Sequence, residues 1–302
     1  MLYQRYRPNS LEDMKGNEEI ISILTKMVED LETCPHAILF VGPKGTGKTT
    51  LARIIADRLG CKGSDLREID IADYRGIDSI REIRKNALFM PMEGDCRVWI
   101  LDEFHRATGD SMSALLKILE DCPKHVYFIL CTTEPQKLLA TLKDRCSTFQ
   151  TKPISDSDMF SLLRKVSRAE GQRLEKVVIE QIVQDSMGHP RNALQVLEQV
   201  LCVAPEKQLA VASRSAEQQS QMIELCRALI NKKRWKEIVV ILSGLKEDND
   251  AESIRRAVLG YCQAVLLKGE NTQAGVVMEC FIPNTYDVGF PGIVFSAYSS
   301  IQ

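Results

Sequence analysis

The 302-residue sequence predicts an α/β fold in which a parallel sheet, covered by helices on both faces, precedes a wholly helical C-terminal part. Across residues 1–152, short apolar runs alternate with segments of helical periodicity, which is the pattern of strands joined by crossover helices. After residue 152 the apolar runs that predict strands cease, and only helical periodicity continues.

The predicted strands are short and apolar. Ala37–Val41 contains no polar residue and ends at a glycine, as expected of a strand buried on both faces. The other predicted strands are Leu66–Ile71, Arg97–Leu101, Val126–Cys131 and a short strand that ends near Phe149. Apolar residues recur every three or four positions between the strands, which predicts helices over Thr49–Leu59, Asp78–Leu88 and Ser111–Glu120.

The rest of the chain is expected to form two helical domains joined by a linker. In residues 153–203, helical spacing covers Asp156–Arg168, Glu175–Ser186 and Arg191–Val203. Residues 204–221 are polar, small and weakly periodic, which predicts the linker. In residues 222–302 the expected helices are Gln221–Asn231, Trp235–Leu245, Ala251–Lys268 and a last one near Ile293–Ser299. With the sheet domain at residues 1–152, this makes three domains.

The composition is that of a globular protein, with 44% apolar and 26% charged residues. A formal net charge of −2 excludes a protein that coats nucleic acid by bulk charge, although one face can still be basic. The ten cysteines include no C-x-x-C pair, which favours reduced thiols over a disulfide scaffold. The sequence predicts neither a membrane span nor a signal peptide, so we expect a cytoplasmic protein.

The strongest functional motif is GPKGTGKT at residues 42–49, which matches G-x-x-x-x-G-K-[ST] between a predicted strand and a predicted helix. Its glycines allow the backbone to wrap phosphate oxygens, and the helix N-terminus adds positive charge. Lys48 is expected to neutralise the β- and γ-phosphates, and Thr49 to ligate Mg²⁺. A glycine-rich turn without a ligand would not require the Lys-Thr pair. The residues expected to bind the nucleotide here are Gly42, Pro43, Gly45, Thr46, Gly47, Lys48, Thr49 and Thr50.

Two carboxylates follow the predicted strand VWIL, about where ligands meet the ends of parallel strands. Asp102 is expected to hold Mg²⁺, and Glu103 to polarise the attacking water. A strand followed by two acids is a weak motif alone, since such acids also cap exposed strand ends. The preceding phosphate-binding motif strengthens the catalytic interpretation.

Further segments resemble the sliding-clamp loader ATPases of the AAA+ class, especially the gamma/tau subunit of bacterial DNA polymerase III. They are DEFH at residues 102–105, SALLKILE at 113–120 and FILCTTEPQKL at 128–138. The opening YQRYRP at residues 3–8 resembles the segment of this family that lies against adenine, which implies that Arg5, Arg7 and Pro8 bind the nucleotide. The resemblance covers residues 1 to about 203 and continues more faintly into a region where the family has a helical collar.

The resemblance implies roles for three more residues. Thr133 matches the polar sensor-1 position that contacts the γ-phosphate or the water, with Thr132 as the second choice. Arg145 matches the arginine finger that reaches the ATP of a neighbouring subunit. It follows Asp144 where the family has Ser, so the acid could pair with the finger and mute it; a surface salt bridge is the alternative role. Arg191 matches the sensor-2 arginine at the start of a lid helix.

The resemblance also implies partners. Arg75, Arg81 and Arg106 would meet DNA phosphates without reading base sequence, although each could equally be a solvated surface arginine. The four-cysteine zinc module of gamma/tau subunits is reduced here to Cys61, so we expect ATP and Mg²⁺ but no zinc. In lacking the zinc module, the sequence is similar to the small subunits of replication factor C and to phage-encoded loaders. The expected partners are other loader subunits in a pentameric assembly, a sliding clamp and primer–template DNA, without a membrane.

The expected function is therefore an ATP-dependent clamp-loader subunit. Two alternatives stay open: a scaffold subunit of the same complex that does not hydrolyse ATP, and another AAA+ DNA motor, such as a branch-migration ATPase. A scaffold would be expected to have a degenerate phosphate-binding motif. A branch-migration motor would be expected to end in a DNA-binding winged helix rather than in further helices.

Overall fold

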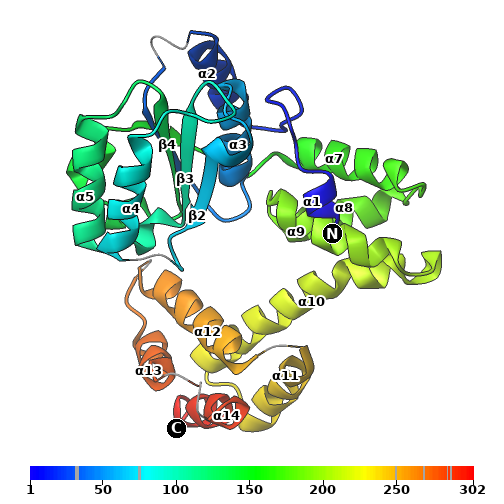
Figure 1. The fold of residues 1–302 in the computed structure, drawn as a ribbon. Helices are drawn as coiled ribbons and strands as arrows, with labels where there is room; N and C mark the ends of the chain where they lie inside the picture. Colours follow the sequence, from blue (N-terminus) through cyan, green and yellow to red (C-terminus); the bar gives the residue numbers. More distant parts are fainter. Residues whose placement is uncertain (31–33, 74–75, 249, 268, 284, 286–287) are drawn as a thin grey trace. The chain divides into compact units, whose positions relative to one another are not determined.

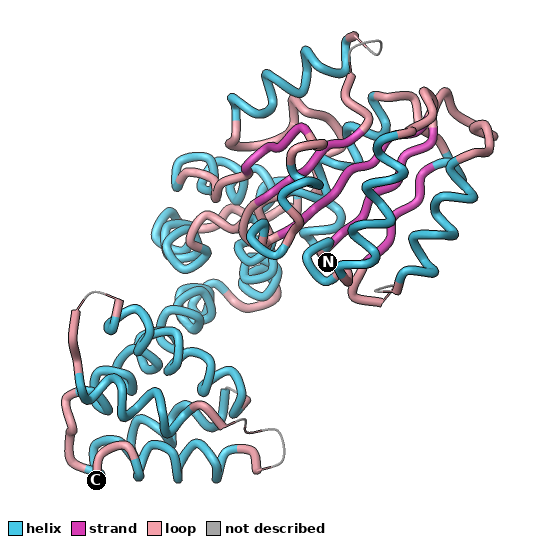
Figure 2. Tube along the Cα trace, turned by 90° about the vertical axis from the view of Figure 1, so that its left-hand side faces the viewer, coloured by secondary structure: helices cyan, strands magenta, loops and turns pink. Residues whose placement is uncertain are grey.

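The structure is a computed structural model that describes residues 1–302 except 31–33, 74–75, 249, 268, 284 and 286–287. The chain divides into two compact units, Met1–Val211 and Ala212–Gln302. Figure 2 shows strands in the first unit and helices and loops in the second. The division falls inside the predicted linker, whereas residue 152 lies within the first unit, so a separate domain over residues 153–203 stays a prediction.

The first unit is built on a parallel sheet of five strands in the order β2-β3-β4-β1-β5, which confirms the predicted α/β class. Figure 1 labels three neighbouring strands of this sheet, β2, β3 and β4. The strands are β1 (Ala37–Val41), β2 (Leu66–Asp70), β3 (Arg97–Asp102), β4 (Val126–Thr132) and β5 (Ser147–Gln150). Val41 pairs with Thr132 on one side and Gln150 on the other, so β1, β4 and β5 end at one edge. Asp70 pairs with Asp102 at the same edge.

Helices cover both faces of the sheet because its buried residues alternate between two apolar clusters. Ile38 and Phe40 of β1 pack on the side of α2 (Glu18–Glu29) and α3 (Lys48–Arg58). Leu39 and Val41 pack on the side of α4 (Ile77–Ala87) and α5 (Gly109–Glu120). The shorter elements here are α1 (Leu2–Arg5), η1 (Gly63–Asp65), η2 (Phe104–Arg106), η3 (Pro135–Lys137) and α6 (Ala140–Lys143).

Three helices follow the sheet, as predicted: α7 (Asp156–Ala169), α8 (Lys176–Ser186) and α9 (Pro190–Leu201). They pack on one another, and α1 packs on α9. The N-terminal segment is thereby held beside the three-helix segment, although the two lie far apart in the chain. This contact supplies part of the candidate site.

The chain from residue 205 onward is helical: α10 (Pro205–Ile230), α11 (Trp235–Asp248), α12 (Ala251–Leu266), α13 (Thr272–Phe281) and α14 (Phe290–Ser299). Residues 205–221, most of the predicted linker, lie within α10 and are therefore not an irregular segment. Their Ala, Gln, Glu and Lys residues are good helix formers, which explains a helix without strong apolar periodicity. Within the described residues, no helix is long and apolar enough to span a membrane.

A buried carboxylate, Asp65, fixes the loop that leads into β3. It accepts hydrogen bonds of 2.7–3.0 Å from the backbone N–H groups of residues 92–94, and Arg97 Nε lies 3.3 Å from Oδ1. Burial alone would raise the pKa of Asp65, but these hydrogen bonds and Arg97 together lower it below its ordinary value.

We predict that Asp65→Asn lowers the free energy of unfolding by about 1–3 kcal/mol at pH 7, because buried N–H groups lose their charged acceptor. A carboxyl group with a lower pKa in the folded chain stabilises the fold above its unfolded pKa of about 3.9, and this contribution is lost as the pH falls through the folded pKa. The difference between variant and wild type in urea unfolding should therefore shrink below about pH 4. The exposed Asp57→Asn is the control, and a loss that did not depend on pH would contradict the assignment.

Candidate functional site

The loop between β1 and α3, residues 42–47, has the curled backbone that a phosphate-binding loop requires. Gly42, Gly45 and Gly47 have φ values of 154°, 78° and 92°, where side chains are strained. A Cβ on Gly42 would lie 2.3 Å from Thr151 Oγ1 and 2.4 Å from its carbonyl oxygen. Thr151 follows β5, so the end of the neighbouring strand packs directly on this loop.

Lys48, the first residue of α3, lies beneath this loop and is only 7% exposed. Its ammonium donates to the carbonyl oxygens of Gly42, at 2.9 Å, and Pro43, at 2.8 Å. Burial lowers the pKa of Lys48 below its ordinary value, although nearby acidic groups oppose the shift. Both of these hydrogen-bond partners are neutral. An anion that replaced the two carbonyl oxygens would therefore be a more favourable partner for the Lys48 ammonium.

A hydroxyl and a carboxylate meet beside the start of α3. Thr49 Oγ1 donates to Asp102 Oδ2 at 2.7 Å, and Asp102 Oδ1 accepts from the Glu103 backbone N–H at 2.9 Å. Hard oxygen ligands of this kind suit Mg²⁺, which usually takes one or two protein ligands besides waters and phosphates. The two residues predicted to hold Mg²⁺ are thus brought together. No group of three or more His, Cys, Asp or Glu side chains suited to a metal occurs among the described residues.

Glu103 follows β3 in a left-handed conformation, with φ of 49°. Its Oε2 is buried and has no hydrogen-bond partner within the described part of the chain, and His105 Nε2 lies 3.4 Å away. Of the two sensor-1 candidates, Thr132 is buried at the end of β4 and contacts His105 Nδ1 at 3.2 Å. Thr133 is half-buried at the next position, and its role stays a prediction.

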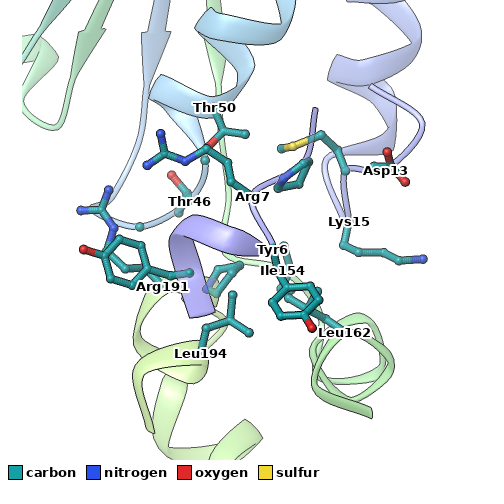
Figure 3. A pocket seen from close by; sticks show the side chains of 16 residues that line it. Tyr6, Arg7, Asp13, Lys15, Thr46, Thr50, Ile154, Leu162, Arg191 and Leu194 are labelled. Atoms are coloured by element: carbon teal, nitrogen blue, oxygen red, sulfur yellow. The ribbon is translucent and has the colours of Figure 1, made fainter. Parts of the chain in front are cut away.

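A pocket opens beside the phosphate loop, between the N-terminal segment and the three-helix segment (Figure 3). Its lining includes seven of the residues expected to bind the nucleotide: Arg7, Pro8, Gly45, Thr46, Gly47, Thr50 and Arg191. Figure 3 shows Arg7 and Arg191 on one side of the pocket, across from Lys15. The Arg191 guanidinium lies 5.6 Å from the centre of the Tyr3 ring. Burial, followed by the nearby Arg53 and Arg191, lowers the pKa of Arg7.

Tyr3 and Tyr6 also line the pocket; they lie in the segment YQRYRP expected against adenine, of which Arg5, Arg7 and Pro8 were the residues expected to bind the nucleotide. Several apolar residues of the pocket wall were not predicted: Met14, Ile154, Leu162 and Leu194. They come from segments far apart in sequence, and no local spacing marks them. Arg5, by contrast, was predicted to bind the nucleotide but is not part of this wall. Its guanidinium pairs with Glu170 at the end of α7, and the Tyr6 hydroxyl donates to the same carboxylate.

Arg145 does not pair with Asp144, as the sequence suggested it could. Its Nη2 lies 2.5 Å from Glu120 Oε1, at the end of α5, and its Nη1 donates to the Thr141 carbonyl at 3.2 Å. The reason is geometric: side chains at neighbouring positions of a helical turn do not face each other, whereas Glu120 lies across from the guanidinium. Both partners are partly exposed, at 39% and 50%, so the pair is weak.

Two of the predicted DNA-binding arginines, Arg81 and Arg106, do not line the pocket. Arg81 is exposed on α4 and pairs with Asp78 at 3.0 Å. Arg106 is exposed in η2, after β3. Arg75 lies outside the described residues. The structure therefore leaves the DNA assignment as a prediction.

The sequence is similar to known replication proteins. Residues 64–155 match the family model described as DNA polymerase III, delta subunit. The chain is 35% identical over 228 residues to DNA polymerase III subunit gamma/tau of Mycobacterium bovis, and 36% identical over 221 residues to subunit tau of Bacillus subtilis. These alignments cover 68% and 66% of this chain but 39% of each relative. Subunit gamma of Buchnera aphidicola is 32% identical over 222 residues, or 67% of this chain and 60% of the relative.

Solved structures resemble the fold. The Holliday junction branch migration motor RuvB of Thermotoga maritima aligns with a TM-score of 0.62 and 20% identity, covering 74% of this chain and 79% of that one. At this identity the likeness concerns the fold alone. It agrees with the parallel sheet and the helices described above.

We predict that Gly42→Ala lowers the free energy of unfolding by about 2–4 kcal/mol, because the added methyl group would overlap Thr151 and the backbone would be strained. Gly109→Ala is the control: Gly109 is the first residue of α5, has open space around it and should lose no stability. Thermal unfolding of both variants measures the difference. Equal melting temperatures would show that Thr151 does not restrain the loop.

Proposed function

The chain belongs to the AAA+ clamp-loader subunits related to the gamma/tau subunit of DNA polymerase III, and from this premise we propose that it binds and hydrolyses ATP to place a sliding clamp on primed DNA. The observation that carries the proposal is the convergence of Lys48, the Thr49–Asp102 pair and Glu103 at one edge of the sheet. Each of these side chains would serve one part of phosphoryl transfer to water.

The base and the triphosphate of ATP would occupy different parts of the site. The apolar pocket walls beside Tyr3 and Tyr6 suit a flat, uncharged base, and the curled loop suits the phosphates. On binding, Lys48 would exchange the carbonyl oxygens of Gly42 and Pro43 for phosphate oxygens. Thr49 and Asp102 would hold Mg²⁺, which neutralises phosphate charge when bound.

For hydrolysis, Glu103 would accept a hydrogen bond from the attacking water. This would turn a lone pair of the water oxygen toward the γ-phosphate. Thr133 would contact the same region from the end of β4. Arg191, at the start of α9, would sense the phosphates and so relate nucleotide state to the three-helix segment. Loss of the γ-phosphate would weaken this contact.

An exposed apolar cluster supports the clamp as a partner. Leu88, Phe89, Met90 and Met92, which follow α4, are 62–78% exposed. Apolar side chains that protrude together in this way usually mark a protein contact. We propose that this cluster docks on the clamp, while Arg81 and Arg106 provide phosphate contacts to duplex DNA that are independent of base sequence.

The two alternatives are less well supported. A non-hydrolysing scaffold has no need of a buried Lys48 beside a Thr–carboxylate pair and Glu103. The likeness to RuvB concerns the fold alone, and the described residues from 205 onward form helices without a strand. Assembly into a pentamer with related subunits, in the cytoplasm, is part of the same proposal.

We predict that Lys48→Met lowers ATP turnover at least about 100-fold, because the developing phosphate charge loses a buried cation. Glu103→Gln should also lower turnover, by about 10²–10⁴, but should keep ATP bound, since only the water-orienting group is lost. Steady-state ATPase assays and equilibrium binding of a fluorescent ATP analogue measure the two effects. Wild-type turnover in Lys48→Met would refute the phosphate-loop assignment.

For Arg145 we predict a role in trans. Arg145→Ala should leave ATP affinity of the isolated chain unchanged but lower turnover in the assembly by about 10³ or more. Mixing Arg145→Ala with Lys48→Met chains should restore part of the activity, because some interfaces then join an intact loop to an intact finger. Glu120→Gln should raise turnover less than about fivefold, since an exposed pair is worth at most about 1 kcal/mol. Normal turnover of Arg145→Ala assemblies would exclude the trans role.

A further inference from the structure

One buried histidine lies beside the proposed catalytic carboxylate, Glu103. His105, in η2, has a side chain that is only 5% exposed. Its Nε2 faces two carboxylates, with Glu103 Oε2 at 3.4 Å and Glu134 Oε1 at 3.2 Å. Its Nδ1 lies 3.2 Å from Thr132 Oγ1. The imidazole therefore connects the ends of β3 and β4.

The surrounding groups determine which ring nitrogen carries the proton. Thr132 Oγ1 already accepts the Glu134 backbone N–H, at 3.0 Å, and its own hydroxyl hydrogen is free to donate to His105 Nδ1. A bare Nε2 would place its lone pair against two carboxylate oxygens. The neutral ring therefore carries its hydrogen on Nε2, and a protonated ring would carry one there as well.

The Nε2–H group faces a carboxylate oxygen that is otherwise unsatisfied. Glu103 Oε2 is buried and lacks a hydrogen bond within the described residues, and at 3.4 Å a small shift of either side chain would close one. Glu134 competes for the same hydrogen, but Lys137 Nζ already lies 2.9 Å from its other oxygen, Oε2. Glu103 has the greater need of this donor, because leaving a buried carboxylate oxygen unpaired is unfavourable.

We propose that His105 is a positioning residue for ATP hydrolysis: its Nε2–H holds Glu103 Oε2, which leaves Oε1 to accept a hydrogen bond from the attacking water. Thr132 fixes the His105 tautomer, so the end of β4 also controls the orientation of Glu103. This inference rests on the proposed function, since it requires Glu103 to act on the water.

The test compares His105→Leu, which removes the donor, with His105→Gln, whose amide N–H can reach a position near that of Nε2. His105→Leu should lower kcat at least about tenfold, as a misoriented general base loses part of its 10²–10⁴ contribution, with the affinity for a fluorescent ATP analogue unchanged. His105→Gln should recover most of the lost kcat. Lys124→Met, in the exposed turn that precedes β4 and away from these carboxylates, is the control with normal kcat.

Combination with Glu103→Gln separates this inference from the proposed function. If Glu103→Gln lowers kcat and His105→Leu adds no further loss in the double variant, the two residues act as one unit. If Glu103→Gln lowers kcat but His105→Leu does not, the inference is wrong and the proposed function stands. If Glu103→Gln has no effect, the proposed function itself fails. Additive losses, or equal losses in His105→Leu and His105→Gln, would also overturn the positioning role.

Discussion

The contact between Thr151 and the phosphate loop is the constraint on which the rest of the site depends. The Thr151 backbone N–H donates to the Val41 carbonyl at 2.7 Å, and its hydroxyl lies 2.8 Å from Thr46 Oγ1. Thr46 Oγ1 also donates to the Pro43 carbonyl at 2.9 Å, inside the loop. The strand end at β5 therefore holds the loop closed, and only glycine fits at position 42 against it. A closed loop is what keeps Lys48 buried under its carbonyls.

The register of the sheet then positions the acidic groups. Because β1 pairs with β4, and β3 with β4, the strand ends bring Asp102 beside the start of α3 and Glu103 beside His105, which in turn contacts Thr132. All of these groups belong to the unit that contains the sheet. A large share of the proposed chemistry thus follows from strand alignment and one curled loop. The contribution of Arg145 differs, because its proposed target lies in another subunit.

Local sequence patterns predicted the parts of the structure in which the same few residues determine both the backbone geometry and the function. The strands, the phosphate loop and the Thr49–Asp102 pair were predicted, since glycine spacing and strand ends constrain them directly. Pocket-wall residues such as Leu162 and Leu194 carry no local signal, and the choice of Glu120 over Asp144 as partner of Arg145 depends on how α5 packs. Helix α13 was not predicted because its glycine and valines have low helix propensity.

The central claim is that the nucleotide site is coupled to a clamp and to DNA. The most direct test is the steady-state ATPase rate of the wild-type chain, assembled with its companion subunits, with and without the cognate clamp and primed DNA. The account predicts a low basal rate, a small response to either alone and a rate several-fold higher with both. It also predicts that this increase does not depend on the base sequence of the DNA and weakens as salt is raised, because phosphate contacts dominate. An ATPase rate that clamp and primed DNA together leave unchanged would contradict the account.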